Sequence, residues 1–194
     1  MATNIEIEAK VLITKEEYDK VVEKMSKFAI GEYDQVNYYI ETKDLALKKL
    51  GVGLRIRKID DKYCMTLKAP MSEGLLEKNN TITEDEYLKF KDHNIFPEND
   101  IYEIVEMLGF NPETMSIVAE LKTHRIETRY GKEQYEFSID KNEYNGIVDY
   151  ELEMNYNSLQ KARVQLEKLC NQLSIEYEDN PKSKQTRALE SLKK

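Results

Sequence analysis

Several segments of this 194-residue chain alternate charged and apolar residues, the period expected of β-strands with one polar face. In the first segment, from Ile5 to Val11, three charged residues share one face: Glu6, Glu8 and Lys10. The same reading predicts further strands at 35–42, 53–60, 62–69, 76–83, 117–130, 133–141 and 147–156. A solvent-facing antiparallel sheet also alternates in this way. The pattern therefore predicts a strand-rich chain without yet predicting a function.

Helices are predicted between these strands from their capping residues. Thr14 with Glu17 forms a capping box that begins a helix over 15–28, and Thr83 begins another through Asp92. Ser158 is expected to cap a third long helix, whose apolar residues repeat at helical spacing. Shorter helical segments are predicted at 46–50, at 98–108 and in the tail after Asn180. Residues 91–112 carry no functional signal.

The charged strand faces carry like charges in pairs. One strand presents Arg55 and Arg57, and another presents Glu151 and Glu153. Like charges at neighbouring positions of one face repel unless a ligand of opposite sign lies between them. A single acid-x-acid-x-base triplet arises about once by chance at this composition, but the repetition over several strands favours a binding surface.

Composition narrows the class of protein. Charged residues make up 34% and hydrophobic residues 40% of the chain, and the net charge is −8. An acidic protein is a poor general nucleic-acid binder, although a locally basic cleft can still bind a small polyanion. We find no apolar run of about 18 residues, so no membrane partner is expected.

The cysteines and histidines give negative indications. Cys64 and Cys170 are too few for a disulfide framework, and His93 and His124 are too scattered for a zinc site. The first predicted strand begins within five residues of the start, which leaves no room for a signal peptide. We therefore expect a cytoplasmic protein.

Charged faces on many antiparallel strands are explained if the sheet closes on itself around a polar lumen. We therefore predict an α+β fold: a closed antiparallel β-barrel that forms a polar tunnel, with helices packed outside. No linker divides the chain, so residues 1–194 are expected to form one domain. Apolar helix faces could also pack on a second copy, so a homodimer is possible.

Short motifs in this order resemble the CYTH family, also called triphosphate tunnel metalloenzymes, and in particular its bacterial YjbK-type branch. The resemblance runs from residue 5 to residue 187. It rests on Ile5-Glu6-Ile7-Glu8-Ala9-Lys10, Asn37-Tyr38-Tyr39-Ile40-Glu41-Thr42, Leu54-Arg55-Ile56-Arg57, Thr66-Leu67-Lys68, Glu77, Thr123-His124-Arg125, Ile139-Asp140, Asp149-Tyr150-Glu151-Leu152-Glu153 and Ser183-Lys184. It implies a tunnel of about eight antiparallel strands.

The resemblance also implies site residues and a reaction, the hydrolysis of a triphosphate with Mg²⁺ or Mn²⁺. The residues that match metal-binding acids are Glu6, Glu8, Asp140, Glu151 and Glu153. Those that match phosphate-binding residues are Lys10, Arg55, Arg57, Lys68, Arg125 and Lys184. Glu77 matches a tunnel acid of unassigned role, and Glu41 replaces a frequent Asp.

Residue chemistry fits this reaction, because triphosphate transfer depends on positioning and on electrostatic stabilisation. Arginine binds phosphate oxygens in a bidentate manner, and carboxylates bind Mg²⁺. The expected catalytic group comprises Lys10, Glu6, Glu8 and Tyr39. Lys10 is either a phosphate contact or a general base, paired with Tyr39, whose pKa nearby cations lower.

The substrate is expected to be a small triphosphate, inorganic triphosphate first, because no aromatic residue can be assigned as a platform for a base or thiamine. Thiamine triphosphatase is the near alternative. A class IV-type adenylyl cyclase is less favoured, because that branch carries a His-Phe pair before its first strand and only four residues precede this one. A non-catalytic polyphosphate or nucleotide sensor would lack the metal-binding acids.

Overall fold

The computed structural model describes residues 2–180 and 182–192. Its strands are β1 (Ala2–Glu6), β2 (Glu8–Ile13), β3 (Ala29–Glu41), β4 (Gly53–Ile59), β5 (Lys62–Pro70), β6 (Leu75–Ile82), β7 (Ser116–Tyr130), β8 (Tyr135–Tyr144) and β9 (Ile147–Asn155). Its α-helices are α1 (Lys15–Met25), α2 (Ala46–Lys49), α3 (Glu84–His93), α4 (Asp100–Met107), α5 (Leu159–Leu173) and α6 (Lys184–Ser191). Short 3₁₀ turns occupy Ser26–Phe28 and Pro112–Thr114.

The strands form one nearly closed antiparallel sheet in the order β1-β6-β5-β4-β3-β7-β8-β9-β2. This confirms the predicted antiparallel β-barrel fold class, with nine strands where about eight were expected. By contacts the chain divides into two compact units that interleave along the sequence. Unit 1 comprises Met1–Ile5, Gln35–Leu121 and Lys184–Lys194, and unit 2 comprises Glu6–Asp34 and Lys122–Ser183.

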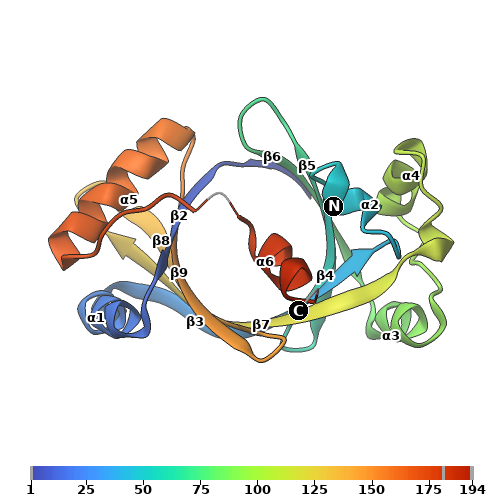
Figure 1. Cartoon of the computed structure of the whole chain (residues 1–194), viewed down its shortest axis with the longest axis horizontal. Helices are drawn as coiled ribbons and strands as arrows, with labels where there is room; N and C mark the ends of the chain where they lie inside the picture. The colour runs from blue at the N-terminus through green and yellow to red at the C-terminus, as the bar shows by residue number, and fades with distance from the viewer. Residues whose placement is uncertain (1, 181, 193–194) are drawn as a thin grey trace. The chain divides into compact units, whose positions relative to one another are not determined.

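In unit 2 the apolar face of the sheet packs against α1 and α5, which lie beside β8, β9 and β2 (Figure 1). Both helices begin where predicted. Thr14 and Glu17 form the expected capping box at α1, whereas the side chain of Ser158 makes no capping hydrogen bond at α5. The core they share with the strands is formed by Val11, Val21, Ile139, Leu152, Leu166 and other apolar residues.

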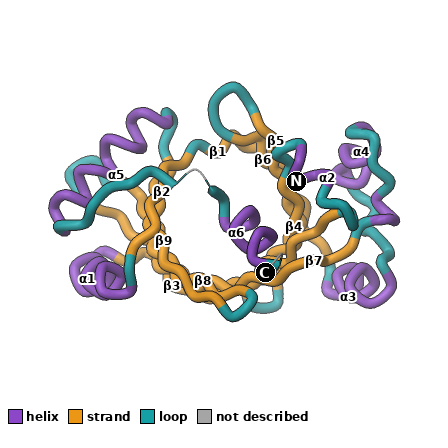
Figure 2. The backbone as a smooth tube through the Cα atoms, in the orientation of Figure 1, coloured by secondary structure: helices purple, strands orange, loops and turns teal. Residues whose placement is uncertain are grey.

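In unit 1 the apolar face of β4, β5 and β6 packs against α2, α3 and α4 (Figure 2). The core residues alternate along each strand, as in Leu54 and Ile56 or Met65 and Leu67. Segment 91–112, which carried no functional signal, contributes Ile101 and Val105 to this core. In the part of the chain that the structure describes, segment 91–112 therefore has a structural role.

Helix α6 differs from the other helices of unit 1 because it lies on the charged face. A Cβ atom added to Gly53 would come 2.6 Å from Oε1 of Gln185 in α6. Gly53 lies in β4 on the same face as Arg55 and Arg57, since side chains alternate. The first turn of α6 is thereby held beside these arginines, and this places Lys184 in their neighbourhood.

The predicted first strand is two strands in the structure. The chain interrupts the strand at Ile7, so that β1 neighbours β6 whereas β2 pairs with β9. Strand β3 begins at Ala29, six residues before the predicted start at Gln35. No helix in the part of the chain that the structure describes is long and apolar enough to cross a membrane.

Candidate functional site

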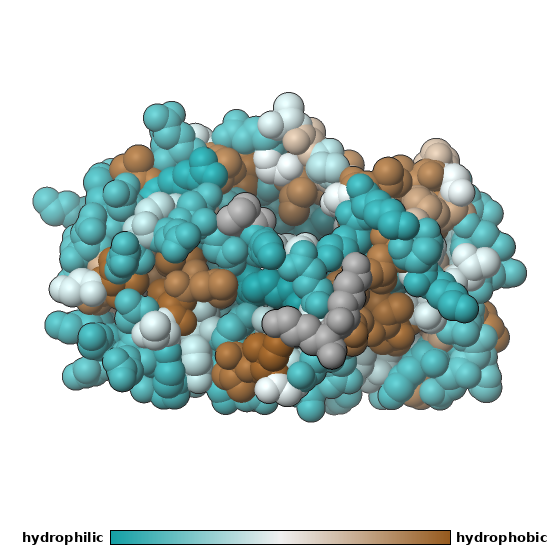
Figure 3. All heavy atoms as spheres, in the orientation of Figure 1, coloured by the Kyte–Doolittle hydropathy of each residue, from teal (hydrophilic) through white to brown (hydrophobic). Residues whose placement is uncertain are grey.

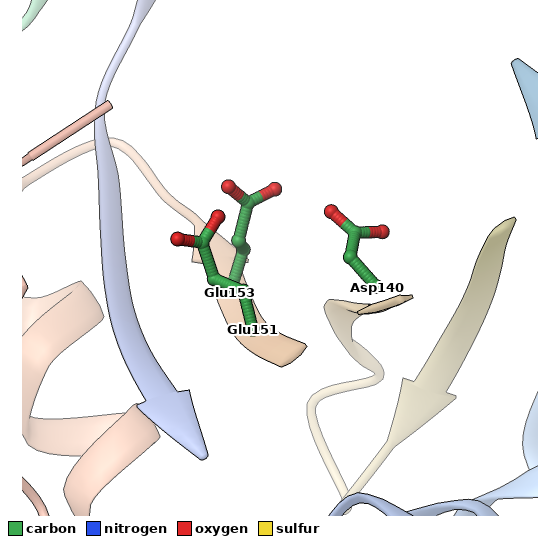
Figure 4. Close-up of side chains that lie close together, drawn as sticks. All are labelled: Asp140, Glu151 and Glu153. Carbon is green, nitrogen blue, oxygen red and sulfur yellow. The ribbon is translucent and has the colours of Figure 1, made fainter. Parts of the chain in front are cut away.

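Three carboxylates of unit 2 converge on one point of its charged face. Asp140 projects from β8, and Glu151 and Glu153 project from β9 toward the same space (Figure 4). Each offers an oxygen, and these oxygens lie within 4.8 Å of one another. The antiparallel register, in which Asp140 faces Glu151, explains their proximity. We refer to these three residues as the acid triad.

Arg125 of β7 binds two members of the acid triad. Its Nε donates to Oδ1 of Asp140 at 2.8 Å, and its Nη2 donates to Oδ2 of the same carboxylate at 2.6 Å. The same Nη2 lies 2.6 Å from Oε2 of Glu153. Register places Arg125 directly opposite Asp140, so this two-pronged pairing follows from strand order.

The electrostatics of this group keep Arg125 charged. Burial by itself would lower the pKa of the guanidinium, but Asp140 and Glu153 raise that pKa well above its usual range. The three carboxylate side chains are almost inaccessible to solvent. Such a concentration of buried negative charge requires a cation. Arg125 supplies one positive charge for three carboxylates.

A divalent cation fits the acid triad. All three donors are carboxylate oxygens, the ligands that Mg²⁺ and Mn²⁺ prefer, and they come from two rigid strands. Glu6 and Glu8 are outside this group of three. Glu8 instead binds the ammonium of Lys10, and Glu6 ends β1 with its side chain partly exposed.

Lys10 lies in the same unit and is nearly buried. Its register partner on β9 is Glu153, so Lys10 borders the acid triad. Asn180, in the segment before α6, reinforces this region in two ways. Its backbone N–H donates to the carbonyl oxygen of Lys10 at 2.9 Å, and its amide donates to Oε2 of Glu151 at 3.3 Å.

The charged face of unit 1 is basic. Arg55 faces Tyr39 across β3 and β4, and Arg57 faces Asn37. Nε of Arg57 donates to Oδ1 of Asn37 at 3.1 Å. Nε of Arg55, by contrast, is buried and has no hydrogen-bond partner among the described residues. A buried guanidinium N–H without an acceptor is costly, and it marks a position where an anionic ligand would bind.

Tyr39 lies fully buried beneath these cations. Burial raises the pKa of its phenol, against the opposing effect of Arg55, Lys184 and other cations of unit 1. Tyr39 is therefore a neutral phenol near neutral pH. Lys184 begins α6, and the next residue, Gln185, lies against Gly53 in the strand that carries the two arginines. The structure thus brings together three of the predicted phosphate-binding residues in unit 1.

Lys68 and Glu77 form an ion pair on the same face. Nζ of Lys68 lies 3.1 Å from one carboxylate oxygen of Glu77, and the amide of Asn79 donates to the other at 2.6 Å. The hydroxyl of Thr66 extends this series of hydrogen bonds by donating to Oδ1 of Asn79 at 2.7 Å. Burial raises the pKa of Glu77, but Lys68 and Asn79 together lower it below its ordinary value. The Glu77 carboxylate is therefore the charged partner that positions the ammonium of Lys68.

Sequence reasoning missed the residues that support these groups. Asn37, Thr66, Asn79 and Asn180 each bind a predicted site residue or its partner. Asn37 and Thr66 stand inside quoted motifs, and the period of two places them on the charged faces. No pattern signals Asn180, because its contacts join segments far apart in the sequence.

Glu41 has a different role from the other acids of the charged strands. It is fully buried, and its carboxylate accepts hydrogen bonds from the backbone N–H groups of Thr42, Leu47 and Lys48. Burial raises the pKa of Glu41, and these N–H groups oppose that rise. Glu41 therefore stabilises the chain around α2.

Comparison with known proteins gives a consistent result. Residues 4–187 match the model of the CYTH domain family. The chain is 31% identical over 176 residues to a Bacillus subtilis protein named "Putative triphosphatase YjbK", and the match covers 90% of each chain.

Two solved structures share the fold. A "putative adenylate cyclase" from Bacillus halodurans is 31% identical with a TM-score of 0.85, and the match covers 96% of this chain and 98% of that one. A "putative adenylyl cyclase" from Hippeastrum, described as having a dominant triphosphatase activity, is 22% identical with a TM-score of 0.78 over 94% of each chain. At this identity the Hippeastrum protein supports the fold alone.

Proposed function

Because this chain belongs to the CYTH family, we propose that it hydrolyses a triphosphate, with inorganic triphosphate as the first substrate to test. The acid triad of Asp140, Glu151 and Glu153 is the observation that carries the proposal. A sensor that only binds polyphosphate has no need of three buried carboxylates around one point. The Bacillus subtilis relative, whose name describes a triphosphatase, supports the same reaction.

The acid triad would hold Mg²⁺ or Mn²⁺ together with the predicted ligands Glu6 and Glu8. When bound, the metal offsets phosphate charge and activates or positions water. On the protein side, Glu151 and Glu153 orient the site from a single rigid strand. Asn180 fixes the side chain of Glu151 through its amide.

The basic face of unit 1 would bind phosphate oxygens. Arg55 offers an N–H group that has no acceptor among the described residues, and Arg57 is oriented by Asn37. Lys68 is oriented by Glu77. Guanidinium groups match the geometry of phosphate oxygens, and they stabilise the charge that spreads over those oxygens during transfer. Lys184 adds a further cation to this set.

Lys10 is proposed as a phosphate contact rather than as a general base. Its ammonium lies against the carboxylate of Glu8, and a neighbouring carboxylate favours the protonated form. A base would need the neutral amine. Tyr39 is buried and neutral, so we propose that it supports the arginines and transfers no proton.

The test is phosphate release from inorganic triphosphate, ATP and thiamine triphosphate, each with Mg²⁺ or Mn²⁺ and with EDTA. We expect metal-dependent release that is fastest from inorganic triphosphate. The ATP reaction is also analysed for cyclic AMP, because the Bacillus halodurans structure carries a cyclase name. Cyclic AMP as the main product would overturn the proposal. Binding without turnover of any substrate would favour a sensor.

The remaining expectations concern compartment and partners. Both cysteines are free thiols, as is usual in the cytoplasm, where we propose that the protein acts. We also propose that both units serve one functional domain, because a single family model matches residues 4–187. The face in Figure 3 is mainly hydrophilic with separate apolar patches, and Met107 is the most exposed of the large apolar side chains. A homodimer stays a prediction.

A further inference from the structure

Arg125 binds the carboxylates that the proposed function assigns to the metal. Resemblance alone implies a phosphate contact for this arginine, yet its guanidinium makes three hydrogen bonds to Asp140 and Glu153. Both oxygens of Asp140 accept from it. A divalent cation that takes an oxygen from either residue must compete with these hydrogen bonds.

We infer that Arg125 is the counter-ion of the acid triad before the metal binds. In that state its guanidinium holds the carboxylates together, and the metal displaces the guanidinium when it binds. The inference rests on the proposed function, because it concerns the same three carboxylates. It assigns Arg125 a positioning role and makes it the residue that sets metal affinity. Once displaced, the guanidinium can bind a phosphate oxygen, so metal binding would prepare the site for its anionic substrate.

Geometry supports this assignment. The Asp140 side chain is fully buried, and those of Glu153 and Arg125 are 6% and 13% exposed, so solvent screens this ion pair only weakly. Three carboxylates within 4.8 Å repel strongly unless a cation lies among them. The guanidinium is the positive group that the structure places against two of them.

The same strand provides a matched control. Arg129 also binds a carboxylate on β8, since its Nε and Nη2 lie 2.8 and 2.6 Å from Oε1 of Glu136. That ion pair is about half exposed on both sides and lies outside the acid triad. Arg129→Gln therefore removes an arginine–carboxylate pair from the same two strands without changing the proposed metal ligands.

The experiment is calorimetric titration of MgCl₂ and MnCl₂ into the full chain, with no phosphate compound present. Arg125→Gln should bind the metal about tenfold or more tightly, because hydrogen bonds to charged groups no longer compete. The metal affinity of Arg125→Lys should lie between those of the wild type and Arg125→Gln, since lysine keeps the charge but not the two-pronged geometry. Arg129→Gln should match the wild type. Unchanged or weaker metal binding by Arg125→Gln overturns the inference.

Asp140→Asn distinguishes failure of this inference from failure of the proposed function. If the wild type binds the metal and Asp140→Asn does not, the metal site is correct whatever the Arg125 variants show. If the wild type binds neither metal and releases no phosphate from any triphosphate, the proposed function fails and the inference fails with it.

A measurement on the wild-type protein covers the case in which Arg125→Gln does not fold without metal. The Nε–H signal of Arg125, identified by its loss in Arg125→Lys, is followed by nuclear magnetic resonance during titration with MgCl₂. Because this N–H donates to Asp140, saturation with Mg²⁺ should shift the signal or abolish its protection from solvent exchange. A signal that stays unchanged while the metal binds overturns the inference.

Discussion

The charged faces of the two units arise from the same sequence pattern but have opposite chemistry. In unit 2 the acids predominate, and Arg125 binds two of the three carboxylates that converge. In unit 1 the cations predominate, and Nε of Arg55 has no acceptor among the described residues. Alternation alone therefore predicts a charged face, whereas the sign of the charge indicates which ligand the face takes.

The comparison also shows how each unit uses a buried acid. Glu151 in unit 2 belongs to the acid triad, while Glu41 in unit 1 accepts hydrogen bonds from backbone N–H groups. Both side chains are fully buried. Burial by itself does not separate a metal ligand from a structural carboxylate, but their hydrogen-bond partners do.

Among the variants of unit 1, the largest effect is expected at Arg55. Arg55→Ala should lower kcat/KM for inorganic triphosphate by about 10²–10³, because a donor to the phosphate oxygens is lost. Steady-state phosphate release measures this change. Arg129→Ala, which removes an exposed arginine, should stay within about twofold of the wild type. Equal activity of Arg55→Ala and the wild type would refute phosphate binding by this face.

Glu41 tests the structural role of a buried acid in unit 1. Glu41→Ala should lower the free energy of unfolding by about 3 kcal/mol, because backbone N–H groups lose their acceptor in a buried place. Urea denaturation measures this change in the free energy of unfolding. The control Asp44→Ala removes an exposed carboxylate and should change stability far less than Glu41→Ala. A loss of activity with unchanged stability would instead make Glu41 a site residue.

Glu77 tests the ion pair of unit 1 through the pH dependence of stability. Glu77→Gln should lower the free energy of unfolding by about 1 kcal/mol at pH 7, because the ion pair with Lys68 is lost. The folded-state pKa of Glu77 lies below its ordinary value of 4.5, so the stabilisation is present above that pH. It is lost as the pH falls through the folded-state pKa.

The difference in stability between the wild type and Glu77→Gln should therefore narrow as the pH falls below about 4.5. Urea denaturation at several pH values follows it. Glu106→Gln, at an exposed position of α4, serves as the control and should show no such trend. A difference that widens toward low pH would contradict the assigned pairing of Glu77 with Lys68.

The smallest effect concerns the two thiols. Cys64 is partly exposed and faces Arg57 on the charged face of unit 1, whereas Cys170 is fully buried, which raises the pKa of its thiol to about 12. A thiol reagent should modify Cys64 in the native protein and Cys170 only after unfolding. Inorganic triphosphate with Mg²⁺ should slow the modification of Cys64. Equal rates with and without triphosphate would place the ligand elsewhere.

Much of the fold could be predicted from sequence because strands and helices follow local rules. The helix starts at Thr14 and Thr83 are set by neighbouring residues, and both are confirmed as capping boxes. The break at Ile7 could not be predicted, because it depends on which strands β1 and β2 neighbour. The same holds for α6, whose place on the charged face depends on a glycine in β4.

The candidate site could be predicted as a set of residues but not as a set of contacts. Alternation and family resemblance both predict Asp140 and Glu153 as site residues, and the resemblance alone predicts Arg125. Their pairing depends on the register between β7, β8 and β9, which no local pattern encodes. For this reason the sequence suggests a phosphate contact at Arg125, while the structure shows the guanidinium bound to carboxylates.

The most direct test of the account is metal-dependent hydrolysis of inorganic triphosphate by Glu151→Gln, compared with the exposed control Glu136→Gln. Glu151 is a member of the acid triad, and in Figure 4 its carboxylate points toward the same space as those of Asp140 and Glu153. The account predicts a fall in kcat of about 10³ with weaker Mn²⁺ binding for Glu151→Gln, and wild-type activity for Glu136→Gln. If the kcat of Glu151→Gln stayed within about tenfold of the wild-type value, the loss would be only that of a single weak contact. This result would contradict the proposed metal site.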